Sequence, residues 1–190
     1  LTSVTIPDSV KRIGCSAFAD CASLKSVKIP DGVTKVEAGV FIRCTSLTSV
    51  TLPASVTAIW SGAFYGCTAL AAETIPEGVT IIGERAFEGC SRLTSIIIPD
   101  NVTIIASDAF SGCRSLVSAR LPNRVTALGS CVFEGCGNLI AVTLPASVRR
   151  IGFGVFTGCG AVFVEEGNPA YRSTPEGALM SADGDELLHV

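Results

Sequence analysis

The stretch LTSIIIPDNVTIIASDAFSGC, Leu93 to Cys113, decides the fold of this chain because its apolar frame recurs with a constant 23-residue period. Five columns keep this period without an insertion, one each of leucine, proline, valine, phenylalanine and cysteine. Their first and last members are Leu1 and Leu139, Pro7 and Pro145, Val10 and Val148, Phe18 and Phe156, and Cys21 and Cys159. A fixed period of this length predicts a solenoid, in which each turn buries its apolar side only against its neighbours.

Each repeat opens with a short strand. Leu93, Ile96 and Ile98 follow the spacing L-x-x-L-x-L, which is typical of a strand with one buried face. Pro99 ends this strand because proline has no N–H to give to a ladder, and Asp100-Asn101 supplies turn residues. We therefore expect neighbouring repeats to pair into a parallel sheet along one face.

The rest of the repeat returns the chain to the start of the next strand. Val102 to Ile105 predicts a second extended piece that points Val102 and Ile105 inward. Ser107 to Cys113 is too short for a free-standing helix, so we expect a single helical or 3₁₀ turn held by packing. The fold class is thus a mainly β repeat solenoid with short helical turns.

Composition agrees with one elongated domain. The chain has 190 residues, 48% of them apolar and 16% charged, and its net charge of −3 gives no basic footprint for nucleic acid. Residues 1–161 carry 13 basic and 11 acidic side chains, whereas residues 162–190 carry one basic and six acidic side chains. We find no membrane-spanning run and no signal peptide. Since Leu1 falls in mid-pattern, we expect a fragment of a longer chain.

The frame L-x-x-V-x-I-P-x-x-V-x-x-I-G-x-x-A-F-x-G-C, over residues 1–161, resembles the BspA-type (Treponema pallidum type) leucine-rich repeat. Asn168-Pro169-Ala170-Tyr171, with the later Asp183-Gly184, is similar to the segment that commonly closes such arrays. The resemblance implies a right-handed curved stack with a parallel sheet on one face. It also implies an extracellular or cell-surface protein of bacteria or some protozoa that adheres to host or matrix proteins.

The carboxyl-terminal end of the chain breaks the period. We divide the chain into seven repeats, residues 1–161, and a capping segment, residues 162–190. Within the cap, Ala178 to Ser181 and Glu186 to Val190 predict a hairpin around the Asp183-Gly184 turn. Such a hairpin would cover the last repeat, whose open edge would otherwise invite aggregation. We interpret Asp183 and Asp185 as turn residues rather than as a metal pair.

Seven of the nine cysteines form one column with a spacing of about one strand, roughly 4.8 Å. Parallel side chains in single file do not converge as a disulfide requires, and they cannot surround a zinc ion. We interpret them as buried, reduced thiols that act as small apolar groups. Cys15 and Cys131 stand outside the column and too far apart to pair; Cys131 is either an exposed thiol or a partly buried one.

Two ionisable residues need separate treatment. His189, the only histidine, has no neighbouring nucleophile in the sequence, so we predict no enzyme activity, no catalytic residue and no cofactor. Glu73 falls in the inward column that holds Val50 and Ile96. A carboxyl group there would have a raised pKa and would destabilise its turn unless it escapes to solvent or meets a backbone donor. We interpret it as a tolerated irregularity.

Binding residues are then sought among the outward positions. On the strands most of these are small, and strong interfaces favour aromatic and arginine anchors. The opposite flank offers Trp60, which replaces a column glycine, and Tyr65. Our candidate partner-binding residues are Lys28, Thr51, Thr74, Ile97, Arg120, Thr143, Trp60 and Tyr65. We expect a protein ligand and neither nucleic acid nor a metal; the alternative is a structural spacer within a larger surface protein.

Overall fold

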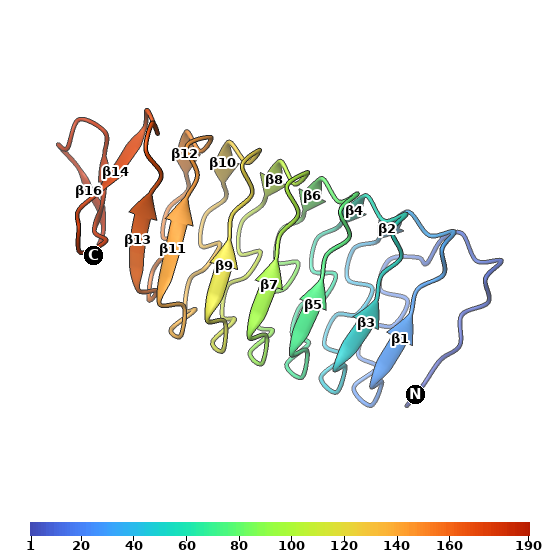
Figure 1. The fold of residues 1–190 in the computed structure, drawn as a ribbon. Coiled ribbons are helices and arrows are strands. Elements are labelled where there is room, and N and C mark those ends of the chain that lie inside the picture. Colours follow the sequence, from blue (N-terminus) through green and yellow to red (C-terminus); the bar gives the residue numbers. More distant parts are fainter.

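The computed structural model describes residues 1–190 and is a stack of similar turns with the two termini at opposite ends (Figure 1). Every repeat from the second onward contributes a strand at the position predicted from the leucine spacing. The strands pair with the register of the sequence period; Ser26 lies opposite Ser49, and Ser95 opposite Ser118. The predicted solenoid is therefore confirmed.

The strands of the L-x-x-L-x-L segments run parallel along one side of the stack, and we call them together the first sheet. They divide into a pair and a set of five. The pair is β1 (Ser26–Lys28) and β3 (Ser49–Thr51); the set of five is β5 (Ala72–Thr74), β7 (Ser95–Ile97), β9 (Ser118–Arg120), β11 (Ala141–Leu144) and β13 (Ala161–Val164).

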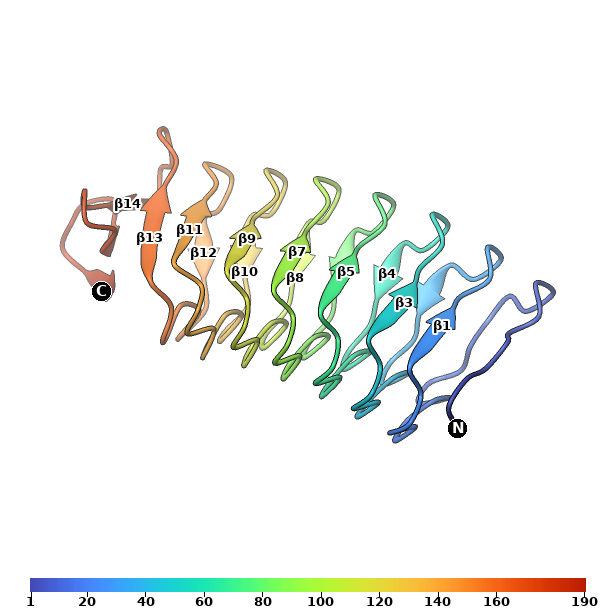
Figure 2. The same cartoon turned by 60° about the horizontal axis from the view of Figure 1, so that its bottom comes forward.

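A second parallel sheet, unbroken over six repeats, is formed by the shorter extended pieces. In Figure 2 its strands lie behind those of the first sheet. The sequence predicted extended pieces here and a parallel sheet on one face; the structure has that sheet and also pairs the extended pieces into a second one. The strands are β2 (Lys35–Val36), β4 (Ala58–Ile59), β6 (Ile81–Ile82), β8 (Ile104–Ile105), β10 (Ala127–Leu128) and β12 (Arg150–Ile151).

The expected helical turn does not form at Ser107 to Cys113, and the structure contains no helix. Some amides there close tight turns, as when Cys113 N–H donates to the Phe110 carbonyl at 3.2 Å. Others reach the next repeat, as when Phe110 N–H donates to the Val132 carbonyl at 2.9 Å. The segment is therefore a series of turns that is hydrogen-bonded between repeats, which a helix would not permit because it uses its amides internally.

Seven phenylalanines form a continuous stack through the core. Neighbouring ring centroids lie 5.0 to 6.3 Å apart, and their planes differ by at most 16°. The rings from Phe41 to Phe133 are fully buried, whereas Phe18 at the amino-terminal end is partly exposed. Each ring thus packs between the rings of the two adjacent repeats, as the period predicted.

The cysteine column lies beside this stack, with its members from Cys44 to Cys136 buried and all nine cysteines free. Each column thiol from Cys44 onward donates to the carbonyl of a phenylalanine of the preceding repeat; Cys67 Sγ, for example, lies 3.1 Å from the Phe41 oxygen. Burial raises the pKa of the Cys67 thiol to about 12. The column holds protonated thiols that link successive repeats, a bonding role that the sequence did not indicate.

Glycine is required where the second sheet turns toward the phenylalanine stack. A Cβ added at Gly83 would lie 2.7 Å from the Ser61 backbone nitrogen, and one at Gly129 would overlap the backbone of Ser107. At Gly83 and Gly129 the adjacent turns therefore approach too closely for a side chain, although Glu37 and Ala106 occupy the same column in other repeats. The same column holds Trp60, whose backbone crowds the position of a Cβ on Gly83. The spacing between repeats is thus set by backbone contact as well as by the buried rings.

The carboxyl-terminal segment closes the stack. Its three strands, β14 (Tyr171–Ser173), β15 (Leu179–Ser181) and β16 (Leu187–His189), form an antiparallel sheet in which β15 and β16 flank the Asp183-Gly184 turn. Asn168 Nδ2 donates to the carbonyls of Pro145 and Val148 at 2.9 and 3.1 Å. His189 lies over Phe156, with ring centroids 6.0 Å apart. The segment thereby covers the last ring and satisfies carbonyls of the last full repeat.

The division at residue 161 falls at the start of a strand of the first sheet. β13 pairs with β11 along its whole length, with Val162 opposite Val142. These two partners are closer together in the sequence than the preceding pair, Ala119 and Val142. The ladder therefore continues where the sequence period stops. Part of the segment expected to cap the array extends it instead.

Candidate binding surfaces

Six of the candidate partner-binding residues share one row on the outer face of the first sheet. Ladder pairing places Lys28 beside Thr51, and Thr74 beside Ile97. Arg120 and Thr143 continue the row. All six side chains are exposed, which follows from the alternation along each strand that buries the neighbouring Val27, Val50 or Ile96.

The carboxyl-terminal half of this face carries large apolar side chains. Ile97 and Ile140 are 67% and 73% exposed, and Val117 and Phe163 are also exposed. Phe163 lies opposite Thr143 and so prolongs the row, although its place after the shortened step hid it from the sequence analysis. Arg120, 3.4 Å from Asp100, lies between Ile97 and Thr143 in the same row. We call Ile97, Val117, Arg120, Ile140 and Phe163 the C-terminal patch.

Trp60 and Tyr65 do not join this surface. They lie on the turn that follows β4 of the second sheet, where Trp60 is exposed and Tyr65 is half-buried. The Tyr65 carbonyl accepts from the Arg43 amide of the preceding repeat at 2.7 Å. Phe153, further along the stack, is 87% exposed. The eight candidate residues therefore belong to two separate surfaces.

The first sheet is interrupted between β3 and β5, and Glu73 lies at the interruption. In a continuous ladder Glu73 would face Val50, yet β3 and β5 are not hydrogen-bonded to each other. The second sheet is continuous at the same repeats, where β4 pairs with β6. Glu73 is 8% exposed and is the one charged residue in an otherwise apolar column, so the irregular residue and the irregular backbone coincide.

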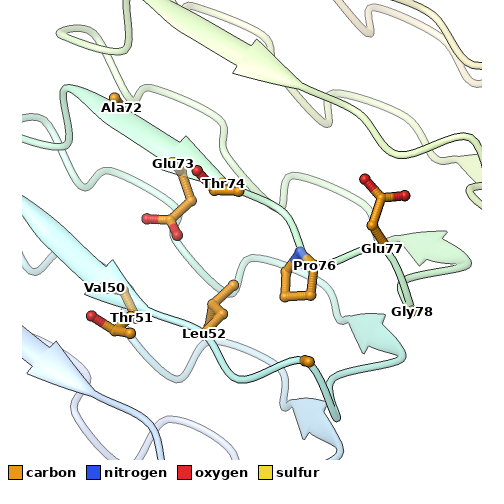
Figure 3. Close-up of a pocket in the computed structure, with 10 residues that line it drawn as sticks. Val50, Thr51, Leu52, Ala72, Glu73, Thr74, Pro76, Glu77 and Gly78 are labelled. Atoms are coloured by element: carbon orange, nitrogen blue, oxygen red, sulfur yellow. The ribbon is translucent and has the colours of Figure 1, made fainter.

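The interruption opens a pocket of about 510 Å³ (Figure 3). The Glu73 carboxylate projects from β5 toward β3 in this view. Leu52, Ala54 and Pro76 supply apolar wall, and Glu77 lines the pocket as a second acidic group. No basic side chain lines the pocket, and neither glutamate takes part in any ion pair of the structure.

Burial raises the pKa of Glu73 to about 8, because desolvation disfavours the carboxylate. Hydrogen bonds from the backbone N–H groups of Val50 and Thr74 act in the opposite direction and are weaker in effect. The sequence analysis expected either a route to solvent or a backbone donor. The structure provides backbone donors and leaves the carboxyl group buried.

One further cluster brings potential metal ligands together. Asp108, Cys131 and Glu134 each offer one atom, and these atoms lie within 4.8 Å of one another. Cys131 is partly buried, as one of the two sequence interpretations held, and its Sγ donates to the Phe153 carbonyl oxygen at 3.7 Å. The neighbouring Glu134 raises the pKa of the thiol to about 11, so the arrangement favours a protonated thiol.

The remaining polar candidates have structural contacts. Asp183 Oδ1 accepts from the backbone N–H of Asp185 at 3.1 Å, which is the turn role expected of it. His189 Nε2 lies 3.0 Å from the Gly160 carbonyl oxygen.

No helix in the structure has the length and apolar character needed to cross a bilayer.

Comparison with known proteins agrees with the geometry of the repeats. The sequence model of the BspA type leucine rich repeat region matches residues 1–116 and 80–164. A crystal structure of a leucine-rich repeat protein from T. pallidum is similar with a TM-score of 0.79 and 35% identity, over 83% of this chain and 76% of that one.

A leucine-rich repeat protein from Bacteroides ovatus is similar with a TM-score of 0.75 and 29% identity, over 87% of this chain. The aligned part is 52% of the B. ovatus chain, so our chain spans about half the length of that protein. No curated protein matches the chain. The chain belongs to the BspA-type leucine-rich repeat family, because both the family model and the T. pallidum structure cover most of it.

Proposed function

We propose that this chain is a protein-binding module of a cell-surface or secreted protein and that it acts by contact rather than by catalysis. The observation that carries the proposal is the C-terminal patch, in which Arg120 lies beside Ile97 on a hydrogen-bonded ladder whose strands also carry other exposed apolar side chains. Contiguous exposed apolar groups with an arginine among them are typical of partner sites. Family membership supports the same class of function.

The ladder suits this role because it fixes the spacing of the side chains before a partner arrives. β7, β9, β11 and β13 are hydrogen-bonded in series, and the buried phenylalanine stack supports them from behind. A preformed surface loses little conformational entropy on binding. His189, the only histidine, is held against the last repeat by its contact with the Gly160 carbonyl.

The test is binding of the purified chain to a panel of purified extracellular-matrix and host-surface proteins, measured by interferometry. Replacing Ile97, Arg120 and Ile140 together by serine should weaken any specific interaction by more than about tenfold, since buried apolar and arginine anchors dominate interface energies. The matched control replaces Trp60 and Tyr65 by serine on the other surface. Loss of binding in that control alone would overturn the assignment to the patch, and no binding by the wild type would favour a structural spacer.

A further inference from the structure

The pocket between β3 and β5 has features that the fold itself does not need. Every other member of the Glu73 column that lies within the first sheet is apolar and buried, from Val27 to Val142. Glu73 places a carboxyl group in that position and is accompanied by a break in the ladder. A carboxyl group buried without a cationic partner destabilises a fold relative to an apolar residue, because it must either hold a proton or lose hydration as a carboxylate. Its presence at the floor of an open pocket therefore points to a ligand that supplies the missing charge.

We propose that this pocket binds the side chain of a lysine or arginine of a partner protein, with the ammonium or guanidinium group against Glu73. This inference rests on the proposed protein-binding function and specifies the chemistry of one contact. It is separate from the C-terminal patch, which lies on later strands of the same sheet.

The lining of the pocket matches such a side chain in both charge and shape. Glu73 holds a proton at neutral pH in the free chain and would release it when a cation binds, and Glu77 adds a second acidic group; no basic residue lines the pocket. Leu52, Ala54 and Pro76 provide apolar walls for methylene groups. Lysine and arginine combine an apolar stem with a charged tip, so their stems can lie along apolar surface while their heads meet a carboxylate.

The location also suits an approach by an extended polypeptide. Since β3 and β5 do not pair, the backbone edges that face each other across the interruption are free of ladder hydrogen bonds. The neighbouring outward residues Thr51 and Thr74 are small and leave the pocket accessible from the outer face of the sheet. A partner side chain can therefore enter without displacing a large residue.

The test uses the whole chain and two small probes, Nα-acetyl-lysine methylamide and Nα-acetyl-arginine methylamide. Binding is followed through the amide resonances of Val50 and Thr74 and the carboxyl ¹³C resonance of Glu73. We expect saturable shifts with at least one charged probe and none with the Nε-acetylated lysine compound, which has the same stem without the charge. Glu73→Gln should weaken binding by about tenfold or more, and Glu77→Gln by less.

Glutamine is nearly isosteric with glutamate, and a thermal unfolding curve shows whether the Glu73→Gln variant folds. If E73Q is unfolded, the Nε-acetylated probe on the wild type supplies the decisive contrast. Equal shifts with the charged and acetylated compounds, equal affinity in folded E73Q, or no saturable shift with either charged probe would overturn the proposal. None of these results would bear on the panel experiment with the C-terminal patch, so failure here is distinguishable from failure of the proposed function.

Discussion

The two sheets of this solenoid are built from the same repeats, yet one is interrupted and the other is not. The second sheet pairs without a break from β2 to β12, whereas the first sheet parts between β3 and β5. The phenylalanine rings of the same two repeats, Phe64 and Phe87, remain 5.0 Å apart, so the core does not open. The difference teaches that two strands can part at one inward position, Glu73, while the rest of the turn stays in register.

The physical reason lies in what each sheet must bury at these repeats. The second sheet buries Ile59 and Ile82, which lie side by side and need no polar partner. The first sheet must bury Val50 and the carboxyl group of Glu73, which takes hydrogen bonds from the Val50 and Thr74 amides. A carboxyl group here replaces the apolar side chain that every other member of this column supplies, and the two strands part at this position.

The largest expected effect comes from the phenylalanine stack, which forms the core between the two sheets. Phe87→Ala removes a fully buried ring from the middle of the stack and should lower the free energy of unfolding by about 3 to 5 kcal/mol. Phe18→Ala, at the exposed end, should cost clearly less. Chemical denaturation measures both, and equal losses would show that the stack does not support the centre of the solenoid.

A change confined to the second sheet should be the next most damaging. Gly129→Ala places a methyl group against a backbone nitrogen of the preceding repeat, so the backbone must shift, at a cost of about 1 to 3 kcal/mol. Gly14→Ala is the matched control, because a Cβ at Gly14 meets nothing within 4 Å. If the two variants unfold at the same denaturant concentration, close backbone approach is not what selects glycine in this column.

The first sheet should respond in the opposite direction when its irregular residue is removed. Glu73→Val gives the column the residue found at Val50, so β3 and β5 can pair and the buried carboxyl group is gone. We expect a gain of about 1 to 3 kcal/mol in the free energy of unfolding, with slower hydrogen exchange at the amides of β5. Glu77→Val, at the mouth of the pocket, should change little; a destabilised E73V would mean that the interruption has another cause.

The same residue also predicts a dependence of stability on pH that originates in the first sheet. The pKa of Glu73 is about 8 in the folded chain against an ordinary value of 4.5, so between these values the folded state retains a proton that the unfolded state releases. Stability is therefore highest below the ordinary pKa and falls as pH rises toward the folded value, by at most about 1.4 kcal/mol per pH unit. The difference between wild type and E73Q isolates this slope from the other ionisable groups, and a difference that stays constant with pH would contradict it.

Much of this architecture could be predicted from the sequence because each column records a direct neighbour contact. Period and composition placed the phenylalanines in one stack and the thiols in another, and register placed Glu73 on the buried side. Register could not show that β3 and β5 would separate, because the repeat period records which residues are neighbours and not whether two neighbouring strands are hydrogen-bonded.

Other features were hidden for equally physical reasons. The strands of the second sheet are too short to show an alternating pattern of burial. Phe163 follows the shortened step between β11 and β13, so it fell outside the period although the ladder brings it beside Thr143. The candidate residues chosen by repeat position therefore included six residues of this surface row but missed Phe163, its aromatic residue.

The central claim is that Glu73 is buried and that its burial accompanies the interruption of the first sheet. Titration of its carboxyl ¹³C resonance in the labelled chain tests this directly. We predict a pKa of about 8. A pKa at the ordinary value of 4.5 would show that the carboxyl group reaches solvent, and it would contradict both the burial and the explanation of the break.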